Sequence, residues 1–179
     1  MTSSSRLKIP VSKDDHFQGP ESASLVLVEF GDYQCPYCGR AYPIVKRLQG
    51  TLGNKLKFVF RNFPLSEMHP DALNAAKIAE AAAGQGKFWE MHDLLYENQE
   101  NLDAESLAGY ARGLNLDVEK LNEAAESGSV KRRIEADFEG GARSGVNGTP
   151  TFYVNGIRYD GDWAYGPFLR ALKELLSRS

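Results

Sequence analysis

Cys35 and Cys38 are the only two cysteines of this 179-residue chain, and only two residues separate them. Two thiols at this spacing can close into a small disulfide and open again, which is the chemistry of a redox-active dithiol. A chain that places its whole thiol content in one such step is predicted to use it for redox chemistry.

Other uses of the two cysteines remain open at this point. A structural disulfide would close so small a loop that it adds little stability in the chain-entropy model. A structural zinc site needs four ligands, and His16, His69 and His92 are scattered singly, without ligand spacing. Copper carriage by a Cys-x-x-Cys pair is harder to separate from redox chemistry, although it usually takes an exposed loop. We predict no metal site.

A buried strand and a helix are predicted on the two sides of the dithiol. The run from Leu25 to Phe30 is short, apolar and rich in β-branched residues. From Pro36 onward apolar residues recur at helical spacing, and proline suits the first position of a helix. Cys35 is therefore expected at a helix N-terminus, where unpaired N–H groups and the helix dipole stabilise a thiolate and lower its pKa. Cys38, one turn later, is expected to be the covered partner.

Composition and charge limit the class of protein. A chain that is 42% hydrophobic and 25% charged is predicted to form one globular domain over residues 1–179. The net charge of −3 argues against nucleic-acid binding, and no apolar stretch approaches the roughly 20 residues of a membrane span. Residues 1–8 contain no apolar segment of a signal peptide. We therefore expect a cytoplasmic protein, or a periplasmic or otherwise extracytoplasmic one from which a leader was removed.

The rest of the chain predicts a mixed order of strands and helices. We expect a first edge strand over Leu7–Val11, a polar connection over Asp14–Ser24, a strand over Leu56–Phe60, and a hairpin of Thr151–Val154 and Ile157–Tyr159 around an Asn-Gly turn. Further helices are expected over residues 72–83, 87–98, 104–114 after an Asp103 cap, about 118–125, about 130–142 with a soft boundary at Gly140-Gly141, and about 167–177.

Glu29 lies within the apolar strand, where a carboxyl group is costly to bury without a task or a partner. One interpretation is that it accepts the proton of Cys38 during thiol exchange, directly or through water. The other is that its side chain reaches the strand edge or pairs with a cation such as Lys57. The sequence leaves both open.

The predicted order, a β-α-β half, a helical stretch and a β-β-α half, is that of the thioredoxin fold, an α/β fold, with a helical insertion at about residues 66–143. Several stretches together resemble the DsbA-like branch of the thioredoxin superfamily, which comprises bacterial disulfide oxidoreductases. Similar domains also occur as appendages of sodium/proton antiporters. The stretches that carry the resemblance are residues 28–38, 61–65, 85–89 and 146–152.

The resemblance implies roles for the residues of the dithiol. Cys35 would be the nucleophile that forms a mixed disulfide with a substrate, and Cys38 would resolve it. Glu29 stands where the family often carries a buried acidic residue. Pro36 and Tyr37, between the two cysteines, would contact the substrate.

Thr149-Pro150 resembles the cis-proline loop of the superfamily. Such a loop packs against the dithiol and offers the backbone of the residue before the proline, here Thr149, to an extended peptide. The alternative is a proline that only begins the next strand.

The resemblance also implies partners: cysteine-containing protein substrates and a redox partner that recycles the dithiol, with no cofactor beyond the dithiol itself. Pro-Tyr between the cysteines is typical of glutaredoxins, whereas strong DsbA oxidants carry Pro-His. Because DsbA lies near −120 mV and glutaredoxins lie at roughly −200 to −230 mV, we expect an intermediate couple, of either an oxidase, a reductase or an isomerase. A metal-carrying or redox-responsive binding module on the same fold is the alternative function.

Overall fold

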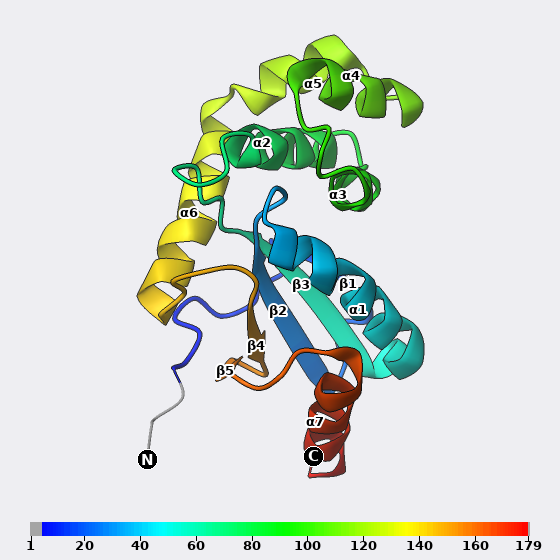
Figure 1. The fold of residues 1–179 in the computed structure, drawn as a ribbon, viewed down its shortest axis with the longest axis vertical. Coiled ribbons are helices and arrows are strands. Elements are labelled where there is room, and N and C mark those ends of the chain that lie inside the picture. The colour runs from blue at the N-terminus through cyan, green and yellow to red at the C-terminus, as the bar shows by residue number, and fades with distance from the viewer. Residues whose placement is uncertain (1–4, 179) are drawn as a thin grey trace.

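A central five-stranded sheet organises the computed structural model, which describes residues 5–178 (Figure 1). The strand order is β1-β3-β2-β4-β5. β2 and β3 are parallel, and the other neighbouring pairs are antiparallel. Residues 1–4, part of the segment in which no leader was predicted, lie outside the described residues, as does residue 179. The strands are β1 His16–Gln18, β2 Leu25–Gly31, β3 Leu56–Asn62, β4 Thr151–Val154 and β5 Ile157–Tyr159.

Helices cover both faces of the sheet and one of its ends. α2 to α5 are stacked beyond one end, and α6 descends from them along the sheet (Figure 1). None of the helices within residues 5–178 is long and apolar enough to cross a membrane. The helices are α1 Pro36–Leu52, α2 Ala72–Ala83, α3 Phe88–Glu97, α4 Ala104–Gly113, α5 Val118–Ala125, α6 Gly128–Ser144 and α7 Tyr165–Ser177, with a 3-10 turn at Gly53–Lys55.

Alternation along β2 divides the core into two parts. Leu25 and Leu27 face the side covered by α1 and α7, whereas Val28 and Phe30 face the side covered by α6. Glu29 shares the face of Leu27, because side chains two apart on a strand point to the same side. The sheet therefore directs this carboxyl group toward α1.

Apart from the first strand, the predicted order of elements is confirmed, including the helix that begins at Pro36 and the hairpin of β4 and β5. The helix predicted over about 130–142 is confirmed as α6, which passes through Gly140 and Gly141 and ends at Ser144. A Cβ at Gly141 would lie 2.9 Å from the rings of Phe30 and Phe63. The missing side chain thus lets α6 approach the sheet closely.

The predicted edge strand over Leu7–Val11 is wrong, and the edge strand β1 lies instead within the predicted connection. From residue 5 on, the N-terminal segment pairs with β5 only at one isolated antiparallel bridge, between Arg6 and Ile157, and after Leu7 side chains hold its backbone. Arg61 Nη1 donates to Ile9 O at 2.8 Å, and Lys8 N donates to Ser144 Oγ at 2.9 Å. Leu7 and Val11 are half-buried against the core on the α6 side of the sheet, whereas Ile9 between them is 42% exposed.

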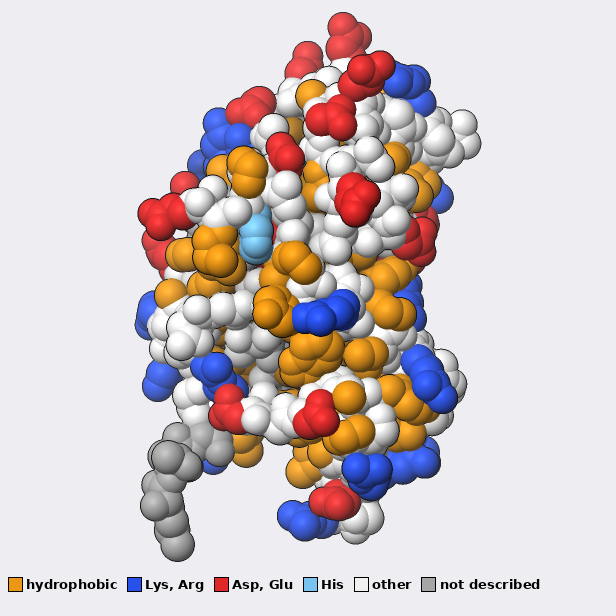
Figure 2. All heavy atoms as spheres, viewed as in Figure 1, with side chains coloured by type: hydrophobic (Ala, Val, Ile, Leu, Met, Phe, Trp, Pro, Cys, Tyr) orange, Lys and Arg blue, Asp and Glu red, His pale blue; other side chains and the backbone are white. Residues whose placement is uncertain are grey.

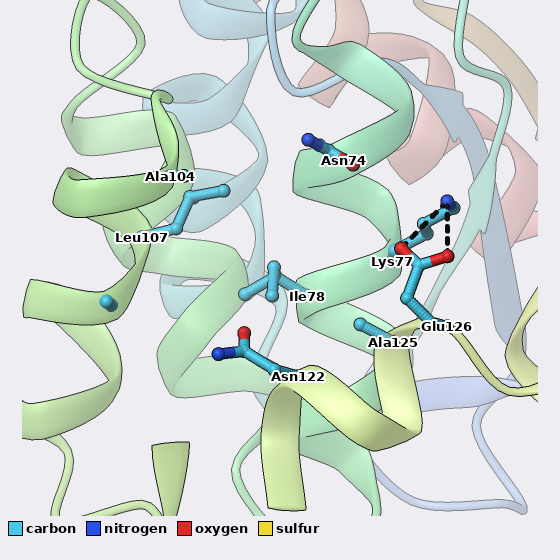
Figure 3. Close-up of a pocket in the computed structure, with 9 residues that line it drawn as sticks. Asn74, Lys77, Ile78, Ala104, Leu107, Asn122, Ala125 and Glu126 are labelled. Carbon is cyan, nitrogen blue, oxygen red and sulfur yellow. Dashed lines mark hydrogen bonds and ion pairs between the residues drawn. The ribbon is translucent and has the colours of Figure 1, made fainter. Parts of the chain in front are cut away.

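A cavity of about 250 Å³ lies among α2, α4 and α5 (Figure 3). Ile78 and Leu107 line it, and Lys77 forms an ion pair with Glu126 at 3.2 Å beside it. Neither cysteine is among its lining residues.

Candidate active site

The dithiol lies at the junction of β2 and α1. Cys35 is the N-cap residue of α1, with extended backbone angles (φ −70°, ψ 122°), and Pro36 occupies the first turn. Gly39 N donates to Cys35 O at 3.0 Å, which closes the first turn of the helix. The predicted position of the cysteine at a helix N-terminus is confirmed.

The pKa of Cys35 is lowered from 9.0 to about 5. The largest cause is the hydrogen bond that the Cys38 thiol donates to it; burial opposes the shift, and Thr149 and the N–H groups of Cys38 and Tyr37 add to it. The protonated thiol donates to Thr149 O at 3.5 Å. The Thr149 hydroxyl, otherwise buried without a partner, can donate to the ionised form. Cys35 is thus largely a thiolate at neutral pH.

Cys38 has the opposite environment. It is fully buried, whereas Cys35 keeps 3% of its surface. Burial, the hydrogen bond with Cys35 and the charge of Glu29 raise the pKa of Cys38 well above its ordinary value. Two thiols one helical turn apart therefore differ sharply in acidity, and of the two only Cys35 keeps any exposed surface.

Glu29 is 2% exposed, and its Oε1 is buried without a hydrogen-bond partner. Its pKa is raised from 4.5 to about 8, first by burial and second by the charge of Cys35. Lys57 lies on the other face of the sheet, where its Nζ is 4.0 Å from the centre of the Phe17 ring. The strand-edge and Lys57-paired alternatives are therefore wrong.

The Thr149-Pro150 bond is cis, and the loop that contains it precedes β4. The contact between Cys35 Sγ and Thr149 O brings this loop, more than a hundred residues away in sequence, against Cys35. Pro36 and Tyr37, between the two cysteines, are exposed, and Tyr37 keeps 56% of its surface. The residues expected to contact a substrate thus flank Cys35.

Asp32 connects the end of β2 to the loop before α2. Its carboxylate accepts hydrogen bonds from Gln34 N at 2.8 Å and Leu65 N at 2.9 Å, and its Oδ2 lies 2.8 Å from His69 Nδ1. Gln34 adds a reciprocal pair, donating from Nε2 to Asp71 Oδ2 at 3.1 Å and accepting from Asp71 N at 2.7 Å. Sequence reasoning missed these residues, because nothing in their spacing indicates a shared partner.

A buried aromatic cluster lies behind the dithiol. Tyr33 and His92 are joined by a contact of 3.1 Å between the tyrosine hydroxyl and Nδ1, and Tyr96 packs on Tyr33. Burial lowers the pKa of His92 well below its ordinary value, so this histidine is a neutral core residue. Tyr96 also lies in the core.

Two exposed apolar side chains lie beside the loop that follows β3. Met68 and Phe138 keep 72% and 38% of their surface, and both line a hollow with Leu65. Figure 2 shows apolar side chains gathered in the middle of one face, whereas acidic side chains gather at the end of the molecule formed by α4 and α5. Among residues 5–178, no group of three or more His, Cys, Asp and Glu side chains is placed to hold a metal ion.

Residues 11–174 match the thioredoxin family. Among solved structures, a thioredoxin-like oxidoreductase from Silicibacter pomeroyi DSS-3 superposes with a TM-score of 0.80 at 28% identity, covering 93% of this chain and 92% of that one. Oxidised BdbD from Bacillus subtilis gives 0.84 at 24% identity, covering 98% of each chain. Alpha-DsbA1 from Wolbachia pipientis gives 0.83 at 19% identity, covering 96% and 95%. The predicted fold class, with helices inserted between the two halves, is thereby confirmed.

Relatives in sequence include parts of much longer proteins. The Na(+)/H(+) antiporter NhaA 1 of Salinispora arenicola is 47% identical over 88% of this chain, and the NhaA 1 of Mycolicibacterium vanbaalenii is 40% identical over 94% of it. The chain spans only 24% and 28% of the length of these relatives.

Proposed function

Because this chain belongs to the thioredoxin family and has a DsbA-like fold, we propose that it exchanges disulfides with the cysteines of other proteins through Cys35 and Cys38. The observation that carries the proposal is the difference between the two thiols. Cys35 ionises at a pKa of about 5 at a helix N-terminus, whereas Cys38 is buried, protonated and hydrogen-bonded to it. This is the asymmetry that a nucleophile and a resolving thiol need.

In the reducing direction, the Cys35 thiolate attacks one sulfur of a substrate disulfide. A bond forms between Cys35 and that sulfur, the substrate S–S bond breaks, and the other substrate sulfur leaves as a thiolate. Cys38 then loses its proton and attacks Cys35 Sγ, which releases the second substrate thiolate and leaves the Cys35–Cys38 disulfide. Two electrons have passed to the substrate. Oxidation of a substrate dithiol is the reverse sequence.

Glu29 supplies the base for the second step. The negative charge of Cys35 is one cause of the raised pKa of Glu29. When Cys35 becomes part of a mixed disulfide, this charge is lost. The carboxyl group then ionises more readily, at the moment when Cys38 must give up a proton. Because Glu29 Oε1 has no other partner, it is free for this transfer, directly or through water.

The substrate class that fits is an extended peptide containing cysteine. It would lie between the Thr149-Pro150 loop and the exposed Tyr37, with its backbone against Thr149. The exchange uses no cofactor beyond the two sulfurs, and a separate redox partner returns the dithiol to its starting state. The protein would act as oxidase, reductase or isomerase according to that partner and to the compartment, whether cytoplasmic or extracytoplasmic.

Covalent trapping tests this proposal. Cys38→Ser should accumulate mixed disulfides with protein thiols on non-reducing gels, because the first step proceeds and the second cannot. Cys35→Ser should trap far fewer and should lose insulin-reducing activity with dithiothreitol. Equal trapping by both variants, or none by either, contradicts the assignment of nucleophile and resolving thiol.

A second candidate is a redox-responsive module linked to an ion transporter. The observation that favours it is the similarity to a part of the two NhaA antiporters. Such a module would change its contacts with a transporter when the dithiol closes, without turnover of protein substrates. Steady-state oxidation of a reduced cysteine peptide in the presence of glutathione separates the two, since only the enzyme turns over repeatedly.

A further inference from the structure

Gln99, which follows α3, holds the backbone of the loop between β2 and α1 at Tyr33 and Cys35. Its Nε2 donates to Tyr33 O at 2.9 Å and to Cys35 O at 2.8 Å, so one amide group holds the two carbonyls on either side of Gln34. Gln99 follows the C-terminal end of α3, which contacts α1 and lies near its N-terminal end (Figure 1). The exchange steps described above make no use of this residue.

One of these carbonyls belongs to the nucleophile itself. Cys35 O also accepts the N–H of Gly39, the first hydrogen bond of α1. Two donors on one carbonyl fix the orientation of the Cys35 backbone. The N–H groups of Tyr37 and Cys38, which hydrogen bond to the thiolate, belong to the same turn. Gln99 therefore acts on the geometry of the groups that stabilise the charge on sulfur.

Gly39 leaves room for this contact. A Cβ at this position would overlap Gln99 Oε1, so any other residue displaces the amide. Gly39 lies inside α1, where alanine is intrinsically more favourable than glycine. The local helix therefore gives no reason for glycine, and the approach of Gln99 gives one.

We propose that Gln99 is a positioning residue for the nucleophile: by holding Tyr33 O and Cys35 O, it keeps the first turn of α1 in the orientation that stabilises the Cys35 thiolate. The inference rests on the proposed exchange function. Its consequence is that a residue of the inserted helical segment affects the acidity of Cys35 and the reduction potential of the dithiol. Without Gln99 the thiolate form is less stable, the disulfide is favoured, and the dithiol becomes a weaker oxidant.

Gln99→Leu tests the inference, because leucine removes the amide at a similar length. Two quantities are measured on the full chain: the rate of iodoacetamide labelling of Cys35 against pH, and the equilibrium with glutathione. Loss of hydrogen bonds of ordinary strength should slow labelling about three- to tenfold at pH 4, leave it unchanged at pH 10, and shift the glutathione equilibrium about three- to tenfold toward the disulfide.

Gly39→Ala should act in the same direction, and the double variant should show little more than the larger single effect, because both changes remove one contact. Gln49→Leu is the matched control. Its Nε2 donates to Gln18 Oε1 at 2.8 Å toward the other end of α1, so the labelling profile should stay that of the wild type.

A Gln99→Leu protein that is less stable but keeps the wild-type labelling profile overturns the inference, since a purely structural contact behaves in that way. Full additivity of Gly39→Ala and Gln99→Leu also overturns it. If Gln99→Leu does not fold, Gly39→Ala alone decides by the same profile. Failure of the proposed function is distinguishable, because it is seen in the wild type as an absence of exchange with protein disulfides.

Discussion

Glu29 makes the stability of the fold depend on pH. The pKa of this carboxyl group is about 8 in the folded protein and 4.5 as its ordinary value, so the folded state holds the proton to higher pH. As pH rises above 4.5 the unfolded state releases its proton and is favoured, and this continues until the folded group ionises near pH 8. At pH 7, two and a half units above 4.5, the loss of stability is about 3 kcal/mol.

Glu29→Gln has no proton to release at this site. The difference in unfolding free energy between variant and wild type should therefore move in favour of the variant by about 3 kcal/mol between pH 4 and pH 7. The shift should be smaller in the disulfide form, which lacks the Cys35 charge that helps to raise the pKa of Glu29. The same variant should resolve mixed disulfides at least about tenfold more slowly, because Cys38 loses its base.

Urea unfolding of the reduced proteins at the two pH values measures the first effect, and stopped-flow resolution of a mixed disulfide with a model peptide measures the second. Glu135→Gln, a change at an exposed position of α6, is the control and should alter neither. A constant stability difference across pH, or an unchanged rate of resolution, would refute the view of Glu29 as a buried, unpaired proton acceptor.

Three other outcomes are expected. In the reduced protein, iodoacetamide should label Cys35 with a midpoint near pH 5 and leave Cys38 unlabelled through neutral pH; equal labelling of both contradicts the assignment. Cys38→Ala should raise that midpoint more than Cys38→Ser, because the hydroxyl of serine still donates to the thiolate. Mass spectrometry of the labelled Cys35 peptide against pH gives the midpoint of each variant. Gly141→Ala should cost about 1–3 kcal/mol in urea unfolding, since the new methyl group meets the Phe30 ring at 2.9 Å, whereas Gly140→Ala, with 3.2 Å to its nearest neighbour, should cost less.

The elements of the fold that could be predicted were those with a local signal. A proline one residue after a cysteine, a run of apolar residues and an Asn-Gly turn each act within a few residues, and they located α1, β2 and the final hairpin. The N-terminal segment was mispredicted because its partners, such as Arg61 and Ser144, are remote in sequence. A short apolar segment can lie against a fold without a β ladder when side chains supply most of its hydrogen bonds.

The residues of the candidate site also divide into those with a signal in the sequence and those without one. The positions of Cys35 and Cys38 follow from local helix chemistry, and the contact with Thr149 was expected from family resemblance. The hydrogen bonds of Asp32 and Gln99 had no such signal. Both depend on how the helical layer packs against the end of the sheet, and glutamine or aspartate at a loop position is compatible with many arrangements.

The position of β2 between β3 and β4 has a consequence for the order in which the site is assembled. The helices from α2 to α6 separate β3 from β4 in the chain, so a ribosome finishes β2, α1 and β3 well before it makes β4. Until then one edge of β2 has no neighbour, and the Thr149 loop that covers the dithiol does not yet exist. Local helical contacts form faster than such distant strand pairing. We therefore expect the nascent chain to pass through a stage in which its two thiols are synthesised but uncovered, and open to oxidation by other proteins before the fold can control them.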